Sequence, residues 1–155
     1  MEIERKFLVN ELLDDLDNYE NKEIEQSYIS IDPVIRLRKS NKEYYLTVKS
    51  KGHLAREEFE ISLTKDQYQN LLLKVDGGQL ISKVRYIIPI ENNLAAELDV
   101  YKGVLEGLLT VEVEFATKKE AEKFLPPEWF GSEVTYEKVY KNSELFIKGL
   151  PKDLK

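Results

Sequence analysis

Hydrophobic and polar residues alternate along most of the chain, with short breaks at turn-forming residues. Successive side chains of a β-strand point to opposite faces, so this two-residue period predicts strands with one apolar and one polar face. In one stretch, Val111 and Val113 share a face while Glu112 and Glu114 share the other. The pattern predicts strands at residues 2–6, 23–30, 34–39, 44–51, 56–63, 80–90, 94–101 and 109–115.

Three stretches carry helix signals instead. Residues 65–74 follow a capping threonine, and residues 117–125 begin with one and end before Pro126-Pro127. Residues 137–147 are predicted as a third helix that ends at a glycine and a proline. Residues 7–20 indicate a short helix or an irregular crossing.

The composition limits the class of protein. A length of 155 residues fits one domain, which we assign to residues 1–155. The chain has no cysteine, so disulfides and thiolate metal sites are excluded and a cytoplasmic location is expected. The acidic, strand-like N-terminus is unlike a secretory signal, and no apolar run is long enough for a membrane span. A net charge of -6 argues against broad nucleic-acid binding.

The charged residues occur as pairs two positions apart, and the two members of each pair have the same sign. The basic pairs are Arg36/Arg38, Lys49/Lys51 and Lys83/Arg85, and the acidic pairs are Glu2/Glu4, Glu58/Glu60, Glu97/Asp99 and Glu112/Glu114. Two folds accommodate this pattern: an open sheet with a solvated charged face, or a closed barrel with a charged, water-filled tunnel. Solvated faces tend to mix signs because like charges repel, so segregated signs favour the barrel.

We therefore predict a mainly β (α+β) fold, a closed antiparallel barrel of eight strands with a few covering helices. About eight strands give an interior that holds side chains or one small ligand. The apolar outer wall needs cover from the three predicted helices or from a partner subunit, so a homodimer is one solution.

The two charged surfaces predict the ligand. Arginine and lysine side chains match phosphate oxygens, and the candidates for binding a polyphosphate are Lys6, Arg36, Arg38, Lys49, Lys51, Arg56, Lys83, Arg85 and Lys138. Carboxylates are hard ligands for Mg²⁺ or Mn²⁺, and the candidates are Glu2, Glu4, Glu58, Glu60, Glu112 and Glu114. Together they indicate metal-assisted hydrolysis of a phosphoanhydride, without a Walker loop.

The ordered motifs resemble those of the CYTH proteins, also called triphosphate tunnel metalloenzymes. The matching motifs are Glu2-x-Glu4-x-Lys6, Arg36-x-Arg38, Thr47-x-Lys49, Arg56-x-Glu58-x-Glu60, Lys83-x-Arg85, Glu97-x-Asp99 and Glu112-x-Glu114. The compact length is similar to the bacterial single-domain tripolyphosphatase branch, as are residues 129–131 and 138–142.

The resemblance implies a fold, an activity and residue roles. The implied fold is a tunnel of eight antiparallel strands, and the implied metal ligands are Glu2, Glu4, Glu112 and Glu114. The resemblance also implies that Lys83 acts in catalysis, positioned by Tyr28. The family often has glycine where this chain has Ser27, before that tyrosine.

Several functions remain open from the sequence. The first expectation is hydrolysis of inorganic tripolyphosphate, and the enzymatic alternatives are thiamine triphosphatase and a class IV-type adenylate cyclase. The non-enzymatic alternative is a polyphosphate-binding module, although simple anion binding gives no reason for an acid-lined wall. For Lys83, a phosphate clamp is the alternative to a catalytic role. Arg5 projects to the other face from Glu4 and is predicted to matter little to turnover.

Overall fold

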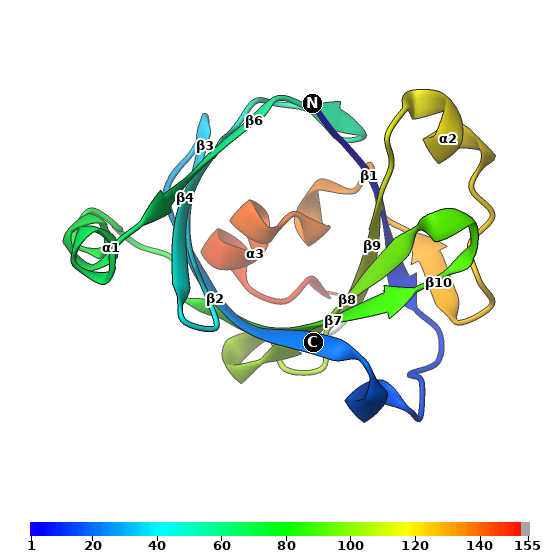
Figure 1. Cartoon of the computed structure of the whole chain (residues 1–155). Helices are drawn as coiled ribbons and strands as arrows, with labels where there is room; N and C mark the ends of the chain where they lie inside the picture. Colours follow the sequence, from blue (N-terminus) through cyan, green and yellow to red (C-terminus); the bar gives the residue numbers. More distant parts are fainter. Residues whose placement is uncertain (153–155) are drawn as a thin grey trace.

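One strongly curved antiparallel sheet dominates the protein (Figure 1), and the computed structural model describes residues 1–152 of it. The strand order is β10-β1-β9-β8-β7-β2-β3-β4-β6, with β5 paired to β1. The strands are β1 (Glu2–Val9), β2 (Glu20–Ile31), β3 (Val34–Ser40), β4 (Glu43–Lys49), β5 (Ala55–Arg56), β6 (Glu58–Leu63), β7 (Ile81–Pro89), β8 (Ala95–Lys102), β9 (Leu109–Glu114) and β10 (Phe130–Glu133).

The sheet closes into a barrel where β5 meets β1. Arg56 pairs with Glu2 and Ala55 pairs with Ile3. Only Glu57 separates β5 from β6, so the two act as one interrupted strand. Counted that way, the circuit β1-β9-β8-β7-β2-β3-β4-β6/β5 has eight members. The predicted mainly β barrel is therefore confirmed, and the strand pairing that closes it involves only the two residues of β5.

Strand β10 joins the sheet outside this circuit and beside the second half of β1. Phe7 pairs with Glu133 and Val9 with Phe130. No strand is predicted here from the sequence, because a strand of four residues is too short to show alternation.

The helices are α1 (Lys65–Leu72), α2 (Lys118–Lys123) and α3 (Asn142–Lys148), with 3₁₀ turns η1 (Leu16–Asn18), η2 (Glu91–Asn93), η3 (Gly103–Leu105) and η4 (Lys138–Tyr140). Figure 1 shows α1 and α2 outside the ring and α3 within its outline. Helix α1 packs the ring of Tyr68 against Tyr44, at 4.9 Å between centroids. None of the helices within residues 1–152 is long and apolar enough to cross a membrane.

The third predicted helix differs from expectation in form and place. Lys141 has extended backbone angles (φ -67, ψ 138) and separates η4 from α3. Phe146 and Leu145 of α3 pack with Tyr28 of β2 and Ile81 of β7. Helix α3 therefore closes one end of the barrel instead of covering its outer wall, which corrects the prediction.

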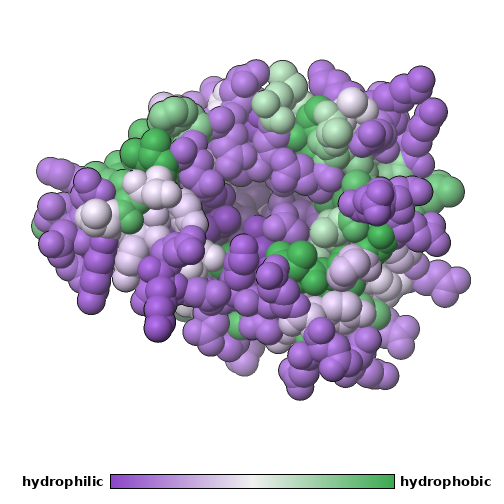
Figure 2. Space-filling model, in the orientation of Figure 1, coloured by the Kyte–Doolittle hydropathy of each residue, from purple (hydrophilic) through white to green (hydrophobic). Residues whose placement is uncertain are grey.

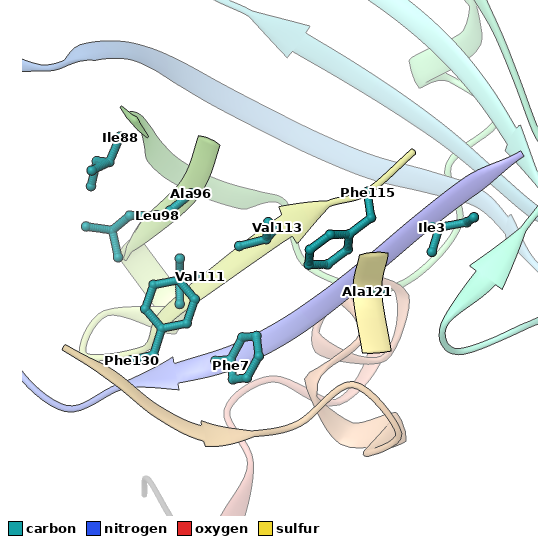
Figure 3. Close-up of a cluster of buried hydrophobic side chains, with 10 residues drawn as sticks. All are labelled: Ile3, Phe7, Ile88, Ala96, Leu98, Val111, Val113, Phe115, Ala121 and Phe130. Carbon is teal, nitrogen blue, oxygen red and sulfur yellow. The ribbon is translucent and has the colours of Figure 1, made fainter. Parts of the chain in front are cut away.

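The main core lies on the outer side of β1, β8 and β9. Figure 3 shows its side chains, which come from these strands, from β7, α2 and β10, and from Phe115 just after β9. Its buried members are Ile3, Phe7, Ile88, Ala96, Leu98, Val111, Val113, Phe115, Ala121 and Phe130. The outer face of β6 lacks such a cover, since Phe59 is 65% exposed and Ile61 is 40% exposed. Whether a second copy of the chain covers this face stays a prediction.

Candidate active site

The charged faces of the strands line a cavity of about 310 Å³ inside the barrel. Figure 2 shows this interior as a hydrophilic hollow in the middle of the ring. The predicted residues that line it are Glu2, Glu4, Lys6, Tyr28, Arg36, Arg38, Lys49, Arg56, Glu58, Glu60, Arg85, Glu112 and Glu114. A second cavity of about 530 Å³ shares Arg38, Glu60, Arg85 and Glu97 with the first and reaches the β3–β4 turn. The two cavities therefore adjoin one another at these four residues.

Strand register brings the opposite charges of the two halves together. Lys6 lies opposite Glu112, and Lys49 lies opposite Glu58. The Lys49 Nζ donates to Glu2 Oε1 at 3.0 Å, although the two residues are 47 positions apart. Arg56 reaches the same carboxylate, with Nε 3.4 Å from Glu2 Oε1. The sequence predicted two surfaces, and the structure shows that ion pairs join them.

The basic half contains the buried Arg36 and the half-buried Arg38, and Arg36 is only partly hydrogen-bonded. Arg36 Nη2 donates to Thr47 Oγ1 at 3.1 Å, while its Nε is buried without a partner in the part of the chain that the structure describes. Arg38 donates to Gln26 Oε1 from Nε at 3.1 Å and from Nη2 at 2.8 Å. Burial, and then the charges of Arg36 and Arg85, lower the pKa of Arg38 to about 9. An unpaired buried donor among repelling cations favours an anionic ligand.

The acidic half crowds its carboxylates. Burial, and then the charges of Glu112 and Glu2, raise the pKa of Glu4 well above its usual value. Burial and a hydrogen bond with Glu2 raise the pKa of Glu58 to about 7. Burial opposes ionisation of Glu112, but Lys6 and Arg85 hold its pKa well below the usual range. Two pairs of carboxyl groups, Glu4 with Glu112 and Glu2 with Glu58, thus shift each other's pKa.

These carboxylates fit a divalent cation by their chemistry. Crowded carboxylates hold either a proton or a cation between them, and their hard oxygens suit Mg²⁺ or Mn²⁺. Within residues 1–152, no three acidic or imidazole groups are already arranged around a common point as ligands. Lys49 and Arg56 occupy positions beside Glu2. A cation would need these side chains to turn from Glu2 toward another anion.

Lys83 lies behind the cavity wall. Its side chain is fully buried, and its Nζ donates to Asp99 Oδ2 at 2.8 Å. Arg85 donates to the same carboxylate, from Nε to Oδ1 at 2.8 Å and from Nη2 to Oδ2 at 2.9 Å. Arg85 lines the cavity, whereas Lys83 does not. Burial lowers the pKa of Lys83 to about 7, with Asp99 opposing and Arg85 and Arg38 reinforcing the shift.

Tyr28 lines the cavity at the end closed by α3. Its hydroxyl accepts a hydrogen bond from Gln26 Nε2 at 3.0 Å. Its ring packs on Phe146, with 5.3 Å between the centroids. Burial raises the pKa of Tyr28, while Arg36 and Arg38 oppose the shift. The hydroxyl therefore remains protonated at neutral pH and can donate a hydrogen bond into the cavity.

Besides Lys83, two further predicted substrate ligands do not line the cavity. Lys51 is 82% exposed in its side chain and pairs with Asp32 at 3.2 Å. Strand β4 ends at Lys49, so the alternation that placed Lys51 on the same face does not continue to it. Lys138 is 72% exposed and pairs with Glu144 at 3.5 Å. The assignment of both lysines to the cavity is corrected.

Sequence reasoning missed other residues of the site. Gln26 and Thr47 hold Arg38 and Arg36, and both lie in predicted strands. Gln26 shares the face of Tyr28 by alternation, which was an unused signal. Thr135 and Lys141 line the cavity from the C-terminal stretch, where no strand period marks the inward side.

Comparisons with known proteins match this geometry. The model of the CYTH domain family matches residues 1–126. An inorganic triphosphatase of Nitrosomonas europaea is 40% identical over 149 residues, covering 94% of this chain and 97% of that protein. An inorganic triphosphatase of Acetivibrio thermocellus is 32% identical over 151 residues, covering 93% and 92%. A crystal structure of an inorganic triphosphatase is 37% identical, covers 97% of each chain and gives a TM-score of 0.71.

Proposed function

The chain belongs to the CYTH domain family, and from that membership we propose that it hydrolyses inorganic triphosphate to pyrophosphate and phosphate in a reaction that depends on a divalent cation. One observation carries the proposal: a single cavity presents Arg36, Arg38 and Arg85 on one side and Glu2, Glu4 and Glu112 on another. The guanidinium groups fit the phosphate oxygens, and the carboxylates fit the cation that accompanies a polyphosphate.

The residues that would hold Mg²⁺ or Mn²⁺ are Glu2, Glu4, Glu112 and Glu114, with Glu58 and Glu60 as further acids. Such a cation neutralises phosphoryl charge and lowers the pKa of bound water when it is present. The protein's own part begins with binding. Lys49 and Arg56, now paired with Glu2, can turn to phosphate oxygens, which leaves that carboxylate available.

The arginines then orient the chain of phosphates. Arg36 Nε offers a donor that is already desolvated, so an oxygen that reaches it replaces no protein contact. Gln26 and Thr47 fix the directions of Arg38 and Arg36 beforehand, which lowers the reorganisation needed during reaction. Phosphoryl transfer depends mainly on such positioning and charge compensation.

We assign different parts to Tyr28 and Lys83. The Tyr28 hydroxyl lines the cavity and is suited to donating a hydrogen bond to a leaving phosphoryl oxygen. Lys83 and Arg85 both donate to the carboxylate of Asp99. While Lys83 stays bound to Asp99, it fixes the position of Arg85; a direct catalytic role requires Lys83 to leave Asp99 during turnover. A catalytic Lys83 predicts that Lys83→Ala lowers kcat much more than it raises KM, and a change in KM alone contradicts that role.

Phosphate release tests the function directly. The wild-type protein is assayed with inorganic triphosphate, thiamine triphosphate, ATP and pyrophosphate, each with Mg²⁺, with Mn²⁺ and with chelator. We expect the highest kcat/KM with inorganic triphosphate, and we expect no phosphate release from any substrate in chelator. Cyclic AMP formed from ATP would instead support a cyclase, and tight binding without phosphate release would support a polyphosphate-binding module.

A further inference from the structure

The connection between β4 and β5 reaches the edge of the cavity. It consists of residues 50–54, here called the rim turn, and His53 of this turn lines the cavity. His53 is the only histidine of the chain and lies outside the motifs that resemble those of the CYTH proteins. Thr135 and Glu137 also line the cavity, and both lie beyond residue 126, where the match to the CYTH domain ends. The family motifs therefore assign no role to these three residues.

The backbone of the rim turn is held in place. The Leu54 carbonyl accepts a hydrogen bond from the Glu4 N–H at 3.0 Å, which ties the turn to β1. Gly52 has φ +149, and an added Cβ would lie 2.3 Å from the Ala55 carbonyl oxygen, so only glycine allows this conformation. The rim turn therefore presents His53 at a defined position.

A second turn, formed by residues 134–137, belongs to the C-terminal stretch and is also tied to β1. The Val134 N–H donates to the Lys6 carbonyl at 2.8 Å, and the Glu137 N–H donates to the Val134 carbonyl at 3.0 Å. Tyr136 of this turn is 63% exposed. Strand β1 thus anchors both turns, one from β4 and one from the C-terminal stretch.

Two contacts join the turns to each other. The ring of His53 packs against the ring of Tyr136, with 5.8 Å between the centroids and 43° between the ring planes. In the adjoining part, Lys141 Nζ donates to the Gly52 carbonyl at 2.8 Å. Tyr136 does not line the cavity, whereas the residues on either side of it do. The aromatic pair therefore bridges the two turns at the outer edge of the cavity.

The cavity inside this bridge leaves little room beyond a triphosphate. Its volume of about 310 Å³ lies at the lower end of the range for small-molecule pockets, which is roughly 300–1,000 Å³. An organic group attached to the phosphoryl group nearest the bridge would have to pass between the two turns. The hydrogen bonds to β1 hold both turns, so the organic group would have to displace the aromatic pair.

We propose that His53 and Tyr136 are specificity-determining residues, whose aromatic contact closes this end of the cavity to an organic substituent and so selects inorganic triphosphate over triphosphate esters. The inference rests on the proposed function. The two rings act by occupying the space that an organic group needs, and neither is assigned a contact with the reacting atoms. Inorganic triphosphate has only oxygen atoms on its terminal phosphoryl groups, so it fits inside the bridge.

Substrate selectivity in a double-mutant cycle tests this role. The kcat/KM values for inorganic triphosphate, ATP and thiamine triphosphate are measured with Mg²⁺ in the wild type, His53→Ala, Tyr136→Ala and the double variant. Tyr136→Phe is the matched control, because it keeps the ring and removes only the hydroxyl group. Thermal unfolding of each variant establishes that it is folded at the assay temperature.

The measured quantity is the ratio of kcat/KM for an ester to kcat/KM for inorganic triphosphate. We expect each alanine variant to raise this ratio about fivefold through a lower KM for the ester, a factor typical of the loss of one aromatic contact. The double variant should have the same ratio as either single variant, because one ring can turn aside once its partner is gone. Tyr136→Phe should keep the wild-type ratio.

An unchanged ratio in the folded alanine variants overturns the inference and leaves the triphosphatase intact, as does a wild type that hydrolyses the esters as readily as inorganic triphosphate. A lower ratio also overturns it, because the pair then binds the organic group instead of excluding it. Strictly additive effects in the double variant contradict a bridge in which both rings are needed. A wild type that hydrolyses no triphosphate overturns the proposed function and the inference together.

Discussion

At the scale of single residues, Glu4 and Arg5 show how strand alternation divides structure from chemistry. Glu4 lines the cavity. Arg5 points outward, where it pairs with Glu133 at 2.7 Å and donates to the backbone carbonyls of Ala121 at 2.8 Å and Phe124 at 3.2 Å. Neighbours in sequence therefore serve the cavity and the outer packing separately.

Replacing each of these two residues should separate activity from stability. Glu4→Gln should lower kcat/KM on the order of 100-fold, because the substitution removes a proposed metal ligand while it keeps the shape of the side chain. Arg5→Ala should leave kcat and KM near wild type but lower the free energy of unfolding by about 2 kcal/mol, since three outward contacts disappear. Phosphate-release kinetics and urea unfolding check both. If Arg5→Ala lost turnover under conditions in which it is fully folded, Arg5 would not serve stability alone and the separation of roles would be wrong.

Prediction from sequence succeeded for residues inside regular strands and failed at their ends. Arg36 and Arg85 lie inward because the two-residue period continues through them. Lys51 lies outside because β4 ends two residues before it. Strand alternation places Lys83 on the inward face of β7, yet its hydrogen bond to Asp99 holds its ammonium group behind Arg85. An ion pair behind the cavity wall, such as Lys83 with Asp99, depends on side-chain length and on the available partners, and strand alternation does not determine either.

At the scale of elements, Arg5 of β1 adds polar contacts with β10 and α2 to the strand pairing and the core packing that join them. Glu133 accepts from Arg5 Nε at 2.9 Å and from Thr135 Oγ1 at 2.6 Å. The hydrogen bond from Arg5, against a smaller effect of burial, lowers the pKa of Glu133 below 4.5. Because the folded pKa is lowered, the ionised carboxylate stabilises the fold at pH values above its unfolded pKa. This contribution is lost as the pH falls through the folded pKa.

Glu133→Gln should therefore destabilise the protein in a pH-dependent way. At pH 7 we expect a loss of about 0.5 kcal/mol, a small value because the pair is partly exposed and screened. The difference from wild type should shrink as the pH falls below 4.5, the ordinary value for this group. Urea unfolding of both proteins at pH 7 and at pH 3.5 measures it. A difference that is constant with pH would contradict the ion pair as its source.

Helix α1 offers an element-scale test that leaves the cavity untouched. Thr64 Oγ1 accepts from the Gln67 N–H at 3.1 Å, and Gln67 Oε1 accepts from the Thr64 N–H at 2.9 Å, which is a complete capping box. Thr64→Ala should lower the free energy of unfolding by about 1 kcal/mol. Thr64→Ser keeps the acceptor and should recover most of that loss. Activity should be unchanged in both, as α1 lies outside the barrel (Figure 1).

Capped helices were predictable and the C-terminal segment was less so. The starts of α1 and α2 follow threonines whose side chains accept from the third helical N–H, a local rule. The split at Lys141 has no local signal, because its extended backbone accompanies a long-range bond to Gly52. Tertiary contacts of this kind decide where the last helix lies.

At the scale of the whole molecule, the barrel separates its charges into two halves that face one another. The closed fold followed from the segregation of signs between strands, since an open solvated face has no reason to keep them apart. The short closure at Arg56 and the cap by α3 did not follow, because neither changes the strand pattern. The acidic half remains crowded, and burial with neighbouring carboxylates raises the pKa of Glu4.

Divalent cations should therefore stabilise the entire fold. A ligand that binds only the folded state at about 100 times its Kd adds about 2.7 kcal/mol. For a domain of this size, that shifts Tm by about 5–10 °C. Thermal unfolding with chelator, Mg²⁺ or Mn²⁺ measures the increment.

Glu4→Gln and Arg5→Ala provide the controls for this effect. The amide of Glu4→Gln resembles the protonated carboxyl that the raised pKa already favours, so its Tm in chelator should equal or exceed that of wild type. It should lose most of the cation increment because a ligand is missing. Arg5→Ala should melt lower in chelator yet keep the full increment. An increment in Glu4→Gln as large as in wild type would place the cation elsewhere than on this carboxylate cluster.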